Sequence, residues 1–99
     1  MSIQGAVYLK AKTPDETLPI TWVIEIPVVS ARVSATVELG VDPSPETTLA
    51  FGPLTYEGEV VQYVTGGLDG VTYRIELLAD LIDNSTISVV SYLPVKETP

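Results

Sequence analysis

The acidic side chains of this sequence are its first candidates for chemistry. Two pairs stand beside predicted turns, Asp15 with Glu16 and Asp80 with Asp83. Paired carboxylates can act as general acid and general base when they share a cleft. The sequence contains no histidine and no cysteine, so it offers no imidazole to orient such a pair and no thiolate nucleophile. We interpret these acids as turn residues that bind their own backbone, and we expect no catalytic residues and no enzymatic activity.

Oxygen-bearing side chains also raise the question of a hard cation such as Ca²⁺. Asp42 and Glu46 lie in one predicted loop and Asp80, Asp83 and Asn84 in another, so loops that meet at one end of the fold would supply oxygen ligands. The sequence has no D-x-D-x-D-G spacing, and solvated turn acids explain the same five residues. We expect no metal and no cofactor, with a loop-bound calcium ion as the alternative.

Two short motifs match known sites only in part. Asn84-Ser85-Thr86 fits a glycosylation sequon, but the chain does not begin with the basic and then long apolar segment of a signal peptide. Gly66-Gly67-x-x-Gly70 resembles a phosphate-binding loop, but it contains no lysine. We interpret both motifs as turns and expect the chain to be made in the cytoplasm.

Length and charge limit the remaining classes of function. The chain of 99 residues suffices for one domain, and 45% of its residues are apolar, so it can bury a core. Its 13 acidic and 5 basic residues give a formal net charge of −8, which nucleic-acid phosphates and anionic membranes would repel. We predict a single domain over residues 1–99, with a core from about 6 to 94 and short flexible ends, that binds neither nucleic acid nor membrane.

Short runs with period-2 alternation lie between the 8 prolines and 7 glycines. Such alternation is typical of half-buried β-strands. The clearest runs cover residues 20–26, 31–39, 73–80 and 87–93, and weaker runs cover about 6–12, 46–51 and 59–65. Only Leu77–Ile82 also fits a helical period, and the alternation that leads into it favours a strand.

The number and spacing of these strands predict an all-β, immunoglobulin-like (Ig-like) or fibronectin-III-like β-sandwich of about seven antiparallel strands, with a small closed barrel as the alternative. The segment Gly67–Ile75 favours the sandwich, because it resembles the turn before strand F. There Leu68 would plug the open end, Gly70 would form the tight connection, and the Tyr73 hydroxyl would bond back to the loop backbone in a tyrosine corner. Trp22 on the second strand would fill the centre of the core.

Three motifs in a fixed order resemble a more specific group of proteins. They are Lys10–Leu18 with its Thr-Pro-Asp-Glu centre, then Trp22, then Gly66–Tyr73 with its three glycines. The likeness covers about residues 8–93 and resembles a family of short tailed-phage proteins, encoded among virion structural genes and described as fibre–tail or head–tail adaptors. It implies an Ig-like sandwich in the virion, made in the bacterial host cytoplasm, that contacts other virion proteins in a symmetric oligomeric assembly.

Apolar side chains that face away from the core mark a candidate partner surface. The alternation places Leu78, Val90 and Tyr92 on the outer side of the last two strands. Leu81 and Ile82 belong to the final hairpin. We predict that these five residues form the contact surface for other virion proteins, and a different strand register is the alternative explanation for their pattern.

Two further expectations concern strand register and sheet edges. Gln62 falls where alternation with Val60 and Val64 requires an apolar residue, so we expect a bulge at Val60-Val61. The N-terminal segment and Ser44–Phe51 are the expected edges, which a partner strand would extend.

The predicted function is that of a non-enzymatic bacteriophage virion structural protein, an adaptor between tail or head–tail components and fibres. The alternative is an Ig-like recognition module that binds a carbohydrate or a cell-surface protein through its end loops, where Tyr56 is the one aromatic residue that we place. A cellular fibronectin-type repeat is disfavoured, since such repeats usually occur in tandem.

Overall fold

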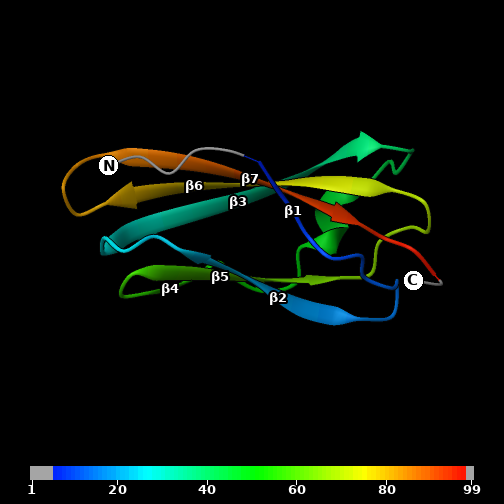
Figure 1. Cartoon of the computed structure of the whole chain (residues 1–99), viewed down its shortest axis with the longest axis horizontal. Coiled ribbons are helices and arrows are strands. Elements are labelled where there is room, and N and C mark those ends of the chain that lie inside the picture. The colour runs from blue at the N-terminus through cyan, green and yellow to red at the C-terminus, as the bar shows by residue number, and fades with distance from the viewer. Residues whose placement is uncertain (1–5, 98–99) are drawn as a thin grey trace.

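Seven strands in two packed sheets make up the computed structural model, which describes residues 6–97 (Figure 1). The strands are β1 (Ala6–Tyr8), β2 (Thr17–Val23), β3 (Val28–Leu39), β4 (Leu54–Tyr56), β5 (Glu59–Thr65), β6 (Thr72–Leu81) and β7 (Thr86–Pro94), with a 3-10 helix η1 (Pro45–Thr48) between β3 and β4. One sheet has the order β1-β7-β6-β3 and the other the order β2-β5-β4. The chain is therefore an all-β fold of two packed sheets, consistent with a β-sandwich.

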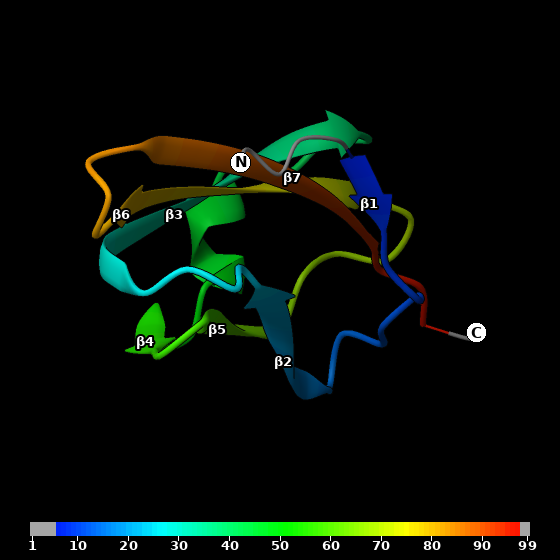
Figure 2. The same cartoon turned by 60° about the vertical axis from the view of Figure 1, so that its left-hand side comes forward.

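The pairing of the strands is antiparallel within residues 6–97, except that β1 runs parallel to β7. Figure 2 shows the two sheets as two layers, with η1 between them. None of the described residues belongs to a helix that is long and apolar enough to span a membrane. The flexible ends predicted from the sequence fall largely on residues 1–5 and 98–99, outside the described residues.

Strand β6 shows why the alternating sequence forms this fold. Its odd-numbered residues from Tyr73 to Leu81 are all buried, while its even-numbered residues are half-buried on the outer side. It pairs with β3 on one side and β7 on the other. The helical alternative for Leu77–Ile82 is therefore wrong, because a helix would break both ladders.

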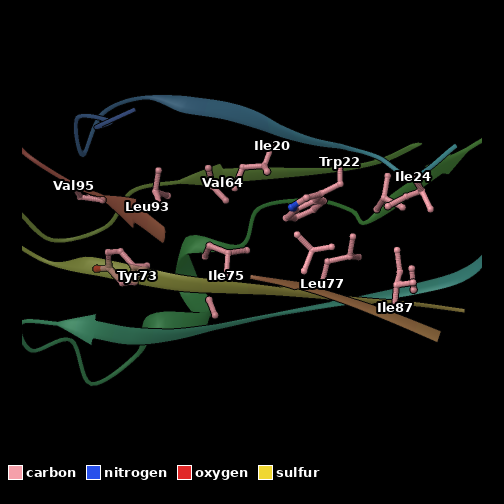
Figure 3. Close-up of a cluster of buried hydrophobic side chains, with 14 of the residues drawn as sticks. Ile20, Trp22, Ile24, Val64, Tyr73, Ile75, Leu77, Ile87, Leu93 and Val95 are labelled. Atoms are coloured by element: carbon pink, nitrogen blue, oxygen red, sulfur yellow. The ribbon is translucent and has the colours of Figure 1, made fainter. Parts of the chain in front are cut away.

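The core lies between the two sheets. Figure 3 shows Ile20, Trp22 and Val64 of the three-stranded sheet, with Ile75 and Leu77 of β6 and Ile87 of β7 on the opposite side of the cluster. Trp22 is buried, and its Nε1 donates a 3.1 Å hydrogen bond to Ser91 Oγ on β7. The indole therefore fills the core and also ties the two sheets together.

The loop before β6 is held by the Tyr73 hydroxyl. This hydroxyl accepts a 2.9 Å hydrogen bond from the backbone N–H of Leu68, as the sequence predicts, and donates one of 2.6 Å to Asp42. Tyr73 is completely buried. Burial, together with the hydrogen bond to Asp42, raises the pKa of Tyr73 to about 12.

The prediction that the Leu68 side chain plugs this end of the core is wrong. Leu68 is 47% exposed, because it approaches Tyr73 with its backbone rather than with its side chain. The buried side chains here are Val71 and Val95. Gly70 has a φ of 84°, which favours glycine, and its N–H donates to the Val95 carbonyl.

The segment before β4 departs from the prediction. Residues 46–51 do not form a strand of their own, since Pro45–Thr48 form η1 and the third strand of the smaller sheet is Leu54–Tyr56. Pro45 is pre-organised for the first helical turn, and the Thr48 hydroxyl donates to the Pro45 carbonyl. The predicted edge at Ser44–Phe51 is thus replaced by β4, whereas the predicted N-terminal edge is present as β1.

The prediction of a bulge at Val60-Val61 is also wrong. Strand β5 pairs with β2 without interruption, from Thr65 to Glu59. Gln62 is buried in regular register, and its Nε2 donates to the backbone carbonyls of Phe51 (3.2 Å) and Tyr63 (2.9 Å). The polar side chain is accommodated because it has these partners, so no change of register is needed.

Pro19 occupies the free edge of β2. Its pairing partner on β5 is Tyr63, whose N–H and C=O bond to Phe51 and Ala50 on the far side. Because backbone groups alternate along a strand, Pro19 also turns its nitrogen away from β5. The ladder loses no hydrogen bond there, and the outer edge of β2 lacks a donor at that position.

A buried lysine joins the two ends of the described chain, and the sequence did not reveal it. Lys12 is 1% exposed, and its Nζ donates 2.6 Å hydrogen bonds to the carbonyls of Thr13 and Gly66. Its backbone N–H donates to the Pro94 carbonyl, and its own carbonyl accepts from Lys96. Burial lowers the pKa of Lys12, and the nearby carboxylates of Glu16 and Asp15 partly oppose that shift.

Candidate functional site

One of the five predicted contact residues lies in the core. Leu81 is 3% exposed, because the inward alternation of β6 continues to its last residue. Its neighbour Ile82, in the turn after β6, is 65% exposed. The prediction is therefore wrong for Leu81, and Ile82 is left at the hairpin end of the molecule.

The other three predicted residues share the outer face of the larger sheet but are not one apolar stripe. Leu78 lies opposite Ser88, whereas Val90 lies opposite Glu76. Glu76 bonds to both Ser88 (3.0 Å) and Arg74 (3.4 Å), and this polar network lies between Leu78 and the other two.

Tyr92 lies opposite Arg74 in the same sheet. Its ring stacks on Tyr8 of β1, with a centroid distance of 4.9 Å. The half-buried side chains on this face are thus partly occupied by contacts within the chain.

The candidate acids serve the local backbone and hydroxyl groups. Asp80 accepts hydrogen bonds from Thr86 and Ser30, which lower the pKa of that carboxyl. Asp83 accepts from Ser85, and this contact lowers its pKa as well. Both therefore act as turn and strand-end acceptors.

The five proposed calcium ligands do not meet. The Asp80 end of β6 pairs with Ser30, whereas Asp42 follows the other end of β3, where Leu39 pairs with Thr72. The two loops thus lie at opposite ends of the fold. Among residues 6–97, no group of three or more His, Cys, Asp or Glu side chains is placed to hold a metal ion.

The outer face of the smaller sheet is the surface that the sequence did not reveal. Side chains of paired residues lie on the same side of a sheet, so the outward residues of β5 define this surface together with their neighbours. We call it the β5 face, and it consists of Glu59, Val61, Tyr63 and Thr65 of β5, Thr17, Pro19, Thr21 and Val23 of β2, Leu54 and Tyr56 of β4, and Phe51.

The β5 face is almost without charge. Glu59 is the one ionisable carboxylate or cationic side chain in the set, and it lies at one end. The outer face of the larger sheet, in contrast, carries Arg32, Arg74, Glu76 and Asp80 on neighbouring strands. The apolar side chains at the margins of the β5 face are well exposed, with Val23 at 63%, Phe51 at 58% and Tyr56 at 53%. Val61 and Tyr63 in the middle of the face are half-buried.

Two aromatic rings stiffen the middle of this face. Phe51 and Tyr63 pack at a centroid distance of 4.5 Å and an angle of 33° between ring planes. Two backbone hydrogen bonds hold Phe51 in this position. The Tyr63 N–H donates to the Phe51 carbonyl, and the N–H of the preceding residue, Ala50, donates to the Tyr63 carbonyl. Exposed aromatic side chains held in this way present contact area at a low entropic cost.

The hairpin end of the β5 face is acidic. The N–H groups of Ile24 and Glu25 both donate to the Gly58 carbonyl, so the turn after β2 lies against the turn between β4 and β5. This backbone contact places Glu25 beside the turn that contains Glu57 and leads into Glu59 at the start of β5. The five basic residues lie elsewhere. Arg32 and Arg74 are on the other sheet, Lys12 and Lys96 meet at the C-terminal end of β7, and Lys10 lies beside Pro19 and Thr21 of β2.

A shallow groove runs along the side where β2 faces β7. It consists of two adjoining pockets of about 220 and 230 Å³ that share Leu9, Ile20 and Thr21. Lys10 is the one ionisable side chain among the described residues that line it. The groove is therefore an apolar opening of the core.

Comparison with known proteins gives no relative: no protein-family model, no curated protein and no solved structure matches this chain.

Proposed function

We propose that this chain is a non-enzymatic structural protein of a bacteriophage virion, an adaptor that links tail or head–tail components to fibres by protein–protein contact. The observation that carries the proposal is the β5 face, an exposed apolar and aromatic surface with one charged side chain. Contiguous apolar patches of this kind are typical of partner surfaces. The phage assignment itself rests on the likeness of sequence motifs.

An Ig-like topology belongs to the same proposal. It is supported by the division of the strands into β2-β5-β4 and β1-β7-β6-β3, with the tyrosine bond at the start of β6. The buried Trp22 on β2 is a further supporting feature.

The size of the β5 face indicates how such an adaptor would act. The seven-residue strands β2 and β5 and the three-residue strand β4 cover a face of roughly 270 Å², or about 300 Å² with Phe51 included. A stable two-protein interface needs about 800 Å² on each partner. A single contact through this face is therefore weak, and a symmetric assembly that repeats it many times gains strength from multivalency.

Quantitative mass spectrometry of purified phage particles tests the virion assignment. We expect this chain at a fixed number of copies per particle, since a closed assembly repeats each subunit a set number of times. Its absence from clean particles, with other tail proteins present, would contradict the assignment.

A recognition module for carbohydrate is the second candidate, and the exposed rings of Phe51 and Tyr56 favour it. Sugar sites use exposed aromatic platforms, and both rings belong to the β5 face. Binding to an immobilised glycan panel that is lost in Tyr56→Ser, together with absence from particles, would place this function first.

A further inference from the structure

We propose that the β5 face binds a partner segment that combines apolar or aromatic side chains with Lys or Arg, the basic groups lying against Glu25, Glu57 and Glu59. This inference rests on the proposed function in one respect, the use of the β5 face for docking. It adds the chemistry of the partner and the orientation in which that partner lies.

The middle of the β5 face is apolar and aromatic. Val61 on β5 lies between Thr21 of β2 and Leu54 of β4, and Tyr63 packs against Phe51. None of these side chains carries a charge. Burial of a partner's apolar or aromatic side chains there therefore favours binding, whereas a charged group placed opposite them would lose its hydration and weaken binding.

The hairpin end of the β5 face carries carboxylates. Glu59 lies in a cross-strand row with Val23 on one side and Tyr56 on the other. Glu57 follows Tyr56 directly, and the Gly58 carbonyl holds Glu25 close to the same turn. The described part of the chain places no Lys or Arg on this end, so a basic group from a partner supplies the missing opposite charge.

A second copy of this chain does not fit this face as the occupant. Each copy has a net charge of −8 and would bring three further carboxylates with the same face. The β5 face of that second copy carries no Lys or Arg to lie opposite the glutamates, so like charges would meet. Charge complementarity thus favours a different, basic partner.

Selection from a displayed library of random peptides tests this chemistry with the purified full chain. We expect the selected peptides to combine aromatic or aliphatic residues with Lys or Arg. Addition of a synthetic selected peptide should shift the amide NMR signals of Glu59–Thr65 and leave those of Arg74–Asp80 unchanged. The mapping needs no variant, so it holds even if a substituted chain folds poorly.

Variants with matched controls distinguish binding at the β5 face from non-specific attraction of a basic peptide to an acidic protein. The double variant Val23→Thr, Tyr56→Ser should weaken binding of the synthetic peptide by at least about tenfold. The control Leu39→Thr, Val41→Ser changes two apolar residues that are more exposed than Val23 and Tyr56 and lie away from the β5 face, and it should leave binding unchanged.

A second pair of variants tests the acidic end. Glu57→Gln with Glu59→Gln should weaken binding about two- to fivefold at low salt. Glu38→Gln with Glu46→Gln removes the same charge elsewhere and should have a smaller effect.

Three outcomes would overturn the proposal. They are selected peptides without an excess of Lys and Arg, equal losses in a variant and its control, and no peptide that binds the face. The particle census above does not enter this test, so failure of the virion assignment and failure of this inference are distinguishable.

Discussion

The hydroxyl of Tyr73 donates a 2.6 Å hydrogen bond to the carboxylate of Asp42, a residue 31 positions earlier in the chain. The same hydroxyl accepts from the Leu68 N–H, and Asp42 in turn accepts from the Ser44 N–H. One buried phenol thus holds the loop after β3 and the loop before β6 at the same end of the fold. Its contribution to stability depends on its remaining protonated.

The variant Tyr73→Phe tests this arrangement through the free energy of unfolding at alkaline pH. The folded pKa of Tyr73 is raised from 10.0 to about 12, so its contribution is fully present below pH 10 and is lost as the pH rises towards 12. We expect Tyr73→Phe to lower the free energy of unfolding by about 1–3 kcal/mol at pH 7, because Asp42 and Leu68 lose a partner. The difference from wild type should shrink between pH 10 and 12.

Urea unfolding of both proteins from pH 7 to 12 measures this difference directly. Lys12, whose pKa is lowered by burial, contributes in the opposite direction as the pH rises. Its contribution is common to both proteins and cancels in the comparison. A difference that stays constant from pH 7 to 12 would show that Tyr73 does not titrate as described.

Leu81 and Ile82 are adjacent, and the structure separates them into core and surface. Leu81→Ala should lower the free energy of unfolding by about 2–4 kcal/mol, because it leaves a cavity between the sheets. Ile82→Ala should change it by less than about 1 kcal/mol, since that side chain is 65% exposed. Thermal or denaturant unfolding decides the matter, and equal losses would contradict the register of β6.

The buried ammonium of Lys12 has an exposed counterpart in Lys10. Lys12→Ala should lower the free energy of unfolding by about 2–4 kcal/mol, because two carbonyl groups lose their donor and a buried stem is removed. Lys10→Ala should stay within about 0.5 kcal/mol of wild type. The same unfolding measurement compares the two, and a similar small effect for both would place Lys12 at the surface.

The two glycines before β6 should respond differently to a methyl group. A Cβ on Gly67 would lie 2.9 Å from Val95 Cγ2 and 3.2 Å from Tyr73 Cε2, whereas a Cβ on Gly66 meets nothing within 4 Å. Both glycines have positive φ, so Gly66→Ala should cost about 1 kcal/mol from the backbone alone. Gly67→Ala should cost about 1–3 kcal/mol more, from overpacking, and urea unfolding measures the gap.

Period-2 alternation predicts most of the strands of this chain, and the prediction fails where local hydrogen bonding favours another structure. The pattern from Tyr73 to Asp80 places β6 correctly, because both faces of that strand follow period 2. Residues 46–51 carry the same kind of pattern, but Pro45 and the threonine hydroxyls favour a 3-10 turn. The polar side chain of Gln62 suggests a change of register that does not occur, because its amide donates to the carbonyl of the adjacent Tyr63 and to that of Phe51 in the preceding segment.

The candidate surface was harder to predict because it depends on which strands are neighbours. Val23, Glu59 and Tyr56 form one row only after β2, β5 and β4 are paired in register. The sequence did contain one signal of this surface. Strand β5 is apolar on both faces, with Val60 and Val64 on one face and Val61 and Tyr63 on the other. Alternation correctly turns Leu78 and Val90 outward, but it does not show that Glu76 binds Ser88 between them.

The missing backbone donor at Pro19 bears on how this chain avoids fibril growth. Strand β2 is an edge of its sheet, and an unbroken outer row of backbone donors on it would template a further strand from another copy. A gap in the middle of that row interrupts such a ladder after a few residues. The chain can therefore display an uncovered apolar sheet face and still resist polymerising through its neighbouring edge.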